Sequence, residues 1–262
     1  MRGKYANVTI KPTIPASIQQ AGTWNDGLIL FDWTEFVLPN STSRLLNSTL
    51  LVRGKDGADQ SSGNFDIELF FAKKFNNTAP PSLGSIRAAV STAGWMNHMT
   101  GTQFLDVTQN NITSTDNLIH MHMLSSGNRA GGPDVVLHSE KETHGYPVEN
   151  TVYVAAVFAS STTCGFSTTV LSRGGTAAGE LIIETDKGAN DDPDADLIFA
   201  PGDVLATTNG TDDRTLGTVK SISAFGSSKQ DINFELPTTS AIADNEEVYN
   251  LNPVTLRLSF EN

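Results

Sequence analysis

The sequence has a single cysteine and no long apolar run, and each of these two shortages excludes a class of protein. Cys164 is the one cysteine among 262 residues, so no intrachain disulfide can form. Its local sequence, SSTTCGFSTT, supplies no cationic or histidine neighbour, which argues against a reactive thiol. No stretch approaches the roughly 18 apolar residues of a membrane span, and the start, MRGKYANVTIKPTIP, lacks a signal-peptide core. We therefore expect a chain made in the cytoplasm without a membrane anchor.

The short motifs that usually carry catalysis are also missing. The sequence contains no nucleophile elbow, phosphate-binding loop, dinucleotide fingerprint or HExxH zinc motif. We therefore expect a protein that is not an enzyme, with no catalytic, cofactor-binding or metal-binding residues. Carboxylate pairs such as Asp66 with Glu68, or Glu246 with Glu247, keep a β-sandwich glycosidase as the enzymatic alternative, because its carboxylates need no local motif.

The negative charge is concentrated in one part of the chain. Residues 175–252 contain 15 Asp and Glu against 4 Lys and Arg, a net charge of −11. The remainder contains 14 against 13, a net of −1, and the whole chain has a net of −12. This acidity argues against a nucleic-acid partner, because phosphates would repel it. The uneven distribution indicates two structural units.

The composition and spacing of apolar residues predict an all-β fold. The chain is rich in Thr, Ser, Asn and Gly, and strand-length apolar runs alternate with turn-forming clusters such as Trp24–Gly27 and Asn76–Pro81. This spacing is typical of an antiparallel, jelly-roll-like β-sandwich. One run, VYVAAVFA at 152–159, does not alternate between apolar and polar residues. It is either a central strand buried on both faces or a strand covered by a neighbouring chain.

The acidic segment predicts a second, smaller unit. Five short strand candidates within residues 175–252, separated by Asp, Asn and Gly, match the size of a small β-barrel. The chain then ends in a regular alternation from Val254 to Glu261, whose charge pattern matches the first unit. We therefore expect a main sandwich formed by residues 1–174 and 253–262, with an acidic barrel inserted at 175–252.

Two stretches superficially resemble metal sites. In LIHMHM, His120 and His122 share one side of an extended strand, but two histidines supply only half of a zinc site. His98, His138 and His144 lie in separate segments, so we expect a solvated strand face, with an inter-subunit contact as the alternative.

The acidic loop places Asp192, Asp194 and Asp196 at alternate positions, as in a calcium loop. Leu197 falls where an EF-hand needs glycine and Asp203 where it needs glutamate, so the motif fails. Weak calcium binding stays open.

The three tryptophans are candidates for a sugar-binding platform. We expect Trp33 to share a face with Phe31 and Trp24 to lie in a turn. Packing in the core or in an interface is the favoured role of Trp24, Trp33 and Trp95, because large aromatic side chains contribute most when they are buried.

Four stretches of the sequence share a pattern with a known family. They are ILFDWTEFVLP, DIELFFAKKFNNTAPPSLG, TVYVAAVF with STTVLSRGG, and the acidic region from IFAPGDVLATTNG to NPVTLRLSFE. Together they resemble virion structural proteins of marine tailed bacteriophages, particularly those that infect cyanobacteria. The resemblance covers most of the chain and rests on pattern. It implies a particle component assembled in the host cytoplasm, and the acidic part resembles the small barrels that such proteins carry as insertions.

These observations favour a capsid decoration (cement) protein that binds the head as a homo-oligomer. Its expected partners are other virion proteins, above all the major capsid protein, and copies of itself. A tail, neck or fibre-associated component is the alternative within the same class. A carbohydrate-binding or receptor-binding module is the alternative outside it.

Overall fold

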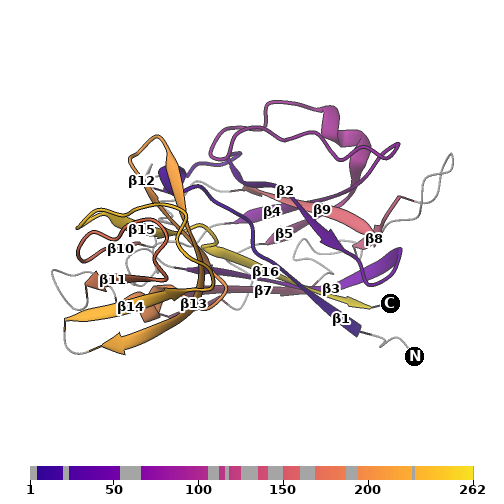
Figure 1. Ribbon diagram of the computed structural model, residues 1–262. Helices are drawn as coiled ribbons and strands as arrows, with labels where there is room; N and C mark the ends of the chain where they lie inside the picture. The colour runs from indigo at the N-terminus through magenta and orange to yellow at the C-terminus, as the bar shows by residue number, and fades with distance from the viewer. Residues whose placement is uncertain are drawn as a thin grey trace.

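The protein is almost entirely built from antiparallel strands, which confirms the all-β prediction (Figure 1). The computed structural model describes residues 5–19, 24–53, 66–105, 112–115, 118–124, 135–140, 150–159, 169–186, 194–225 and 228–261. The described helices are short: α1 (Ala16–Gln19), α2 (Ala195–Ile198) and the 3₁₀ helix η2 (Gly94–His98). No helix in the described ranges is long and apolar enough to cross a membrane.

Two sheets form a β-sandwich. In the first sheet the strand order is β1-β16-β3-β7-β6, and β8 also pairs with β3. Its strands are β1 (Tyr5–Ile10), β16 (Val254–Glu261), β3 (Thr42–Arg53), β7 (Leu118–Leu124), β6 (Ile112–Thr115) and β8 (Val136–His138). In the second sheet the order is β2-β9-β4-β5. Its strands are β2 (Ile29–Val37), β9 (Thr151–Phe158), β4 (Ile67–Lys73) and β5 (Met99–Leu105).

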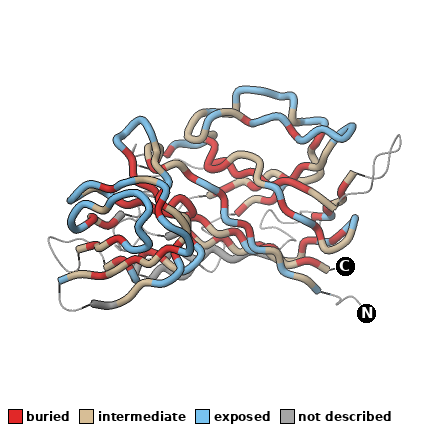
Figure 2. Tube along the Cα trace, in the orientation of Figure 1, coloured by how far each residue is buried: buried red, intermediate tan, exposed pale blue. Residues whose placement is uncertain are grey.

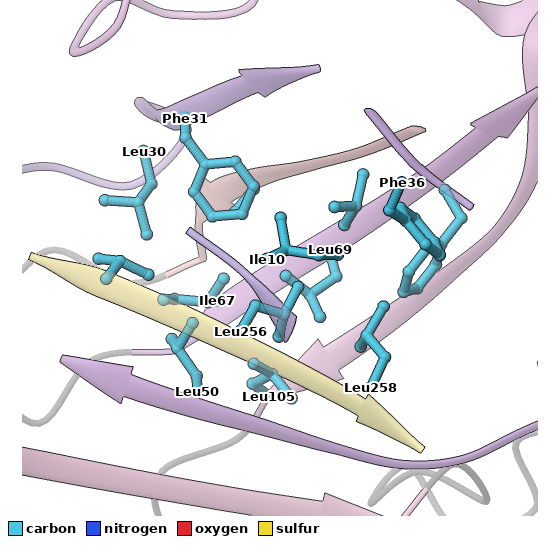
Figure 3. Packing of buried hydrophobic residues seen from close by; sticks show 14 of the residues in the cluster. Ile10, Leu30, Phe31, Phe36, Leu50, Ile67, Leu69, Leu105, Leu256 and Leu258 are labelled. Carbon is cyan, nitrogen blue, oxygen red and sulfur yellow. The ribbon is translucent and has the colours of Figure 1, made fainter. Parts of the chain in front are cut away.

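The C-terminal strand lies inside the first sheet, as its alternation predicts. β16 pairs with β1 on one side and with β3 on the other, so that Leu256 lies opposite both Ile10 and Leu50. These three side chains belong to the core between the two sheets (Figure 3). Burial of each such side chain contributes about 1.5–3 kcal/mol, so β16 is a main source of stability for the sandwich.

Strand β9 is buried on both faces because it is the second strand of a covered sheet. Val154 and Ala156 point into the sandwich core, whereas Ala155 and Val157 pack against a second cluster that contains Leu83. The segment that follows β4 lies over the second sheet (Figure 2), and its Leu83, Val90 and Trp95 belong to the cluster on the outer face of that sheet. Of the two explanations for the non-alternating run, the central buried strand is the one confirmed.

The third sheet forms the small barrel. Its order is β10-β15-β12-β13-β14-β11. Its strands are β10 (Thr169–Leu171), β15 (Glu247–Asn250), β12 (Val204–Thr208), β13 (Asp213–Phe225), β14 (Lys229–Phe234) and β11 (Ile182–Asp186). An antiparallel bridge between Ser172 and Thr185, with a 2.8 Å hydrogen bond from the Arg173 amide to the Glu184 carbonyl, joins β11 back to the end of β10. The sheet thereby nearly closes around its own apolar core.

One strand joins the barrel from outside the predicted segment. β10 precedes residue 175, yet it pairs with β15, and Val170 packs in the barrel core. The sequence predicts five strands for the barrel, whereas its sheet has six strands in the structure. The exact division of the chain at 174 and 252 stays a prediction.

The prediction that Trp33 shares a face with Phe31 is wrong, because β2 is bulged. Three steps along β2, from Phe31 to Thr34, match two steps along β9. The extra residue reverses the alternation. Phe31 consequently lies in the sandwich core, whereas Trp33 packs on the outer face of the same sheet.

Candidate interaction site

The segment that follows β1 attaches the sandwich to the barrel. Lys11 Nζ lies 3.0 Å from Asp203 Oδ1, and the Asp203 side chain is only 1% exposed. The second carboxylate oxygen of Asp203 accepts hydrogen bonds from the Ala200 amide at 2.9 Å and from Asn250 Nδ2 at 3.0 Å. A buried carboxylate is stable only when it is paired in this way, so this contact holds Lys11 against the barrel.

Further hydrogen bonds extend the attachment along residues 11–19. The Ile14 amide donates to the Leu251 carbonyl at 2.8 Å, and Gln19 Nε2 donates to the Asn250 carbonyl at 2.7 Å. The Ser17 amide donates to Asp213 Oδ1 at 2.9 Å. Ala16, Ala206, Tyr249 and Leu251 form a small apolar cluster beside them. Polar and apolar contacts together fix the barrel near the C-terminal end of β1.

The described residues of the acidic loop do not form the calcium site that its sequence superficially resembles. Asp203 is occupied by Lys11, Ala200 and Asn250, and Asp196 is exposed on α2. Asp192 lies outside the described residues. Among the described side chains, no group of three or more His, Cys, Asp or Glu residues is arranged to hold a metal ion.

The histidines that the structure describes lie in η2, β7 and β8. His120 and His122 occupy register positions opposite Leu51 and Thr49 on β3, and their side chains lie outside what the structure describes, as do His144 and Cys164. His98 is buried, and its Nδ1 lies 3.0 Å from the Lys73 carbonyl oxygen. His138 belongs to β8 and lies opposite Thr42.

The tryptophans pack against other side chains. Trp24 is fully buried in the sandwich core, with its ring centroid 5.1 Å from that of Phe158. Trp33 and Trp95 are partly buried on the outer face, with ring centroids 6.4 Å apart. The Trp33 indole N–H donates to the Pro81 carbonyl at 2.9 Å, so this ring fastens the covering segment to the sheet.

A second cluster of polar and charged groups lies at Glu246 in the barrel. Burial alone would raise the pKa of the Glu246 carboxyl. The Ala243 amide, the Thr207 hydroxyl and the Arg214 guanidinium donate hydrogen bonds to it, and together they lower its pKa below the ordinary value. Arg214 also donates to the Ala241 carbonyl at 3.2 Å. The cluster therefore fastens the loop before β15 onto β12 and β13.

Of the carboxylate pairs noted in the sequence, Glu246 and Glu247 diverge. Glu246 points to Arg214, whereas Glu247 accepts a hydrogen bond from the Tyr249 hydroxyl. Asp66 and Glu68 are both partly buried, on either side of the start of β4.

The open strand edges belong to the sandwich. Its first sheet ends in β1 and β6, and its second sheet ends in β2 and β5. Unpaired backbone groups at such an edge can pair with another chain. In the described part of the barrel, the bridge between Ser172 and Thr185 joins the two end strands β10 and β11, so the sheet is nearly closed.

Two of the sandwich edges are protected by irregular geometry. β2 is bulged, and at its start Ile29 exchanges backbone hydrogen bonds of 2.9 and 2.8 Å with Ala88 and Arg87. β5 has an extra residue, Thr100, between the positions that match Ala72 and Phe71 of β4. Bulges of this kind discourage further strand pairing.

Comparison with known proteins does not identify the chain. No family model and no curated protein matches it. Among solved structures, one from "Life in the extremes: atomic structure of Sulfolobus Turreted Icosahedral Virus" is 10% identical, with 98% of this chain and 91% of that chain covered and a TM-score of 0.19. Another, "Crystal Structure of the STIV MCP", is 9% identical, with coverages of 98% and 97% and a TM-score of 0.20. TM-scores this low do not establish a common arrangement of strands.

Proposed function

We propose that this protein is a non-enzymatic structural component of a virion, and that it decorates the capsid surface as a homo-oligomer. The sandwich contacts the major capsid protein and other copies of the chain, and the acidic barrel faces solvent. The sequence resemblance to virion proteins of tailed bacteriophages motivates the class of function.

The observation that carries the proposal is the contrast between an open, nearly neutral sandwich and a nearly closed, acidic barrel. The sandwich offers strand edges for pairing, and its segments together have a net charge of −1. The barrel sheet is nearly closed, and residues 175–252 have a net charge of −11. Contacts between copies through the barrel would bring like charges together, whereas contacts through the sandwich would not.

Location on the particle tests this proposal directly. Purified particles of the virus that encodes the chain are imaged, and the chain is located with a specific antibody fragment. Binding of the fragment over the head surface is expected. Binding at the tail, neck or fibres would favour the alternative within the same class, and absence of the chain from particles would overturn the proposal.

Dissociation of the particles tests how the protein is attached. Graded salt is expected to leave the protein attached, and graded denaturant is expected to release it, because burial and strand pairing supply the affinity. Complete release by salt alone would show an electrostatic attachment and contradict the proposal.

A further inference from the structure

We infer that β1 is a self-association edge, and that two copies of this chain pair antiparallel through it to continue the first sheet of the sandwich. The inference deepens the proposed self-association and rests on it. It names the surface, the strand direction and the symmetry of the contact.

The first argument is that, in the part of the chain that the structure describes, β1 lacks the usual protection of an edge strand. Its sequence, YANVTI, has no charged residue, no proline and no glycine. Its six residues pair with β16 in an unbroken register, without a bulge. Among the described strands it pairs with β16 alone. Natural edge strands are normally blunted by charge, proline, bulges or covering segments, so an unprotected edge indicates a strand that pairs with another.

The other edges show what such protection looks like in this protein. β2 has its bulge and its hydrogen bonds to residues 87 and 88, and β5 has the extra residue Thr100. β6 spans only four residues, and β11 is joined to residues 172 and 173. The lack of protection on β1 is therefore a local feature within the described residues, since β2, β5, β6 and β11 each have a bulge, a short length or a bridge.

The second argument concerns the partner and its direction. β1 ends at Ile10, and Lys11 immediately contacts the barrel through Asp203, so the barrel lies at the C-terminal end of β1 (Figure 1). Parallel pairing of two copies would place two acidic barrels side by side. Antiparallel pairing places them at opposite ends of the joined sheets, where their charges do not oppose association.

A second copy also suits an edge without charges. Asn7 and Thr9 are exposed on β1, and they alternate with Val8 and Ile10, which turn toward the core. A two-fold contact pairs a strand with itself, so both sides are equally polar and equally uncharged. An acidic or basic partner strand would find no complementary charge within β1.

The experiment measures the mass of the purified full chain in solution. We compare the wild type with the double variant Asn7→Lys and Thr9→Lys, which puts like charges across the pairing strands. The matched control, Thr211→Lys with Thr215→Lys, adds the same charge at exposed positions of the barrel. Sedimentation equilibrium is expected to give a dimer for the wild type and the control. The edge variant is expected to dissociate with a Kd raised about tenfold or more.

Small-angle scattering of the dimer tests its direction, because antiparallel pairing gives an elongated particle with a barrel at each end. A wild-type monomer at the highest soluble concentration, a wild-type trimer, or an edge variant that dimerises as tightly as the control would overturn the inference. A dimer with both barrels at one end would overturn the antiparallel arrangement.

The particle experiments separate this inference from the proposed function. An edge variant that is monomeric but still binds particles leaves both the β1 contact and the virion role standing. A wild-type dimer that dissociates through β1 but is absent from particles supports the inference and removes the proposed role.

Discussion

The sandwich and the barrel solve the problem of strand edges in opposite ways. The barrel nearly closes its sheet through the bridge of Ser172 with Thr185, and it tolerates a concentration of Asp and Glu on its surface. The sandwich leaves its sheets open, and most of its edges are guarded by bulges or short strands. A nearly closed sheet has little need of charge to prevent pairing, so the acidity of the barrel is better explained by solubility and by repulsion between copies.

The two parts also differ in the spectroscopic signals that follow their unfolding. Trp24, Trp33 and Trp95 all lie in the sandwich, and these are the only three tryptophans in the chain. Tryptophan fluorescence therefore follows unfolding of the sandwich, whereas far-ultraviolet circular dichroism follows the strands of both parts. Comparison of the two signals shows whether the parts unfold together.

The largest expected effect comes from a cavity in the sandwich core. Leu256→Ala on β16 is expected to lower the free energy of unfolding by about 2–5 kcal/mol, because the side chain is fully buried between Ile10 and Leu50. Urea unfolding followed by tryptophan fluorescence measures the change. The neighbouring variant Arg257→Ala, at an exposed position of the same strand, is expected to stay within about 0.5 kcal/mol. Equal effects of the two variants would contradict the core assignment.

A smaller effect is expected at the junction between the two parts. Asp203→Asn removes the charge that pairs with Lys11 and is expected to cost about 1–3 kcal/mol. The fluorescence and circular dichroism transitions should also move apart, because the barrel is then held less firmly. The control is Lys229→Met, which breaks an exposed pair with Glu184 and is expected to cost about 0–1 kcal/mol. Transitions that remain coincident in Asp203→Asn would show that this ion pair does not couple the parts.

The third effect depends on pH and belongs to the barrel alone. The pKa of Glu246 is lowered from its ordinary value of 4.5, so its ionised form is favoured by folding. This stabilisation is fully present above the unfolded pKa and is lost as the pH falls through the lower, folded pKa.

Glu246→Gln is therefore expected to cost about 1–2 kcal/mol near neutral pH, because hydrogen bonds to a charged acceptor are weakened. The difference from wild type is expected to shrink below about pH 4.5. Thermal unfolding by circular dichroism across this pH range measures it. A difference that stays constant down to low pH would mean that the charge of Glu246 has no role.

The sequence predicts the strands well because burial sets their periodicity. The alternation from Val254 to Glu261 correctly predicts a strand paired in the main sheet, and the non-alternating run in β9 correctly predicts burial on both faces. Trp33 is misplaced because a bulge depends on backbone pairing with β9, which one strand's sequence does not specify. The three-residue strand β10 is too short for its sheet to be assigned by periodicity.

The contact between Lys11 and Asp203 cannot be predicted from the sequence, for a different reason. In the sequence, Asp203 stands where a calcium loop of the EF-hand type needs glutamate. Its partner Lys11 is 192 residues away in the sequence. Contacts at such separation leave no local pattern, and Asn250 belongs to a third segment. The unguarded edge of β1 has a signal in its uncharged sequence, but its position at the end of a sheet comes only from the fold.

The smallest expected effect is a response to salt that differs between the two parts. Raising the ionic strength from about 0.01 M to about 0.1 M shortens the screening length from about 30 Å to about 10 Å. In the barrel this screens repulsion within a segment of net charge −11, so its stability is expected to rise by up to about 1 kcal/mol. The sandwich segments have a net charge of −1, so tryptophan fluorescence should report a smaller shift. The sandwich thus serves as an internal control for salt effects unrelated to charge. Equal shifts in both signals would mean either that the parts unfold as one unit or that the barrel's acidity does not destabilise it, and the junction variant Asp203→Asn distinguishes these two cases.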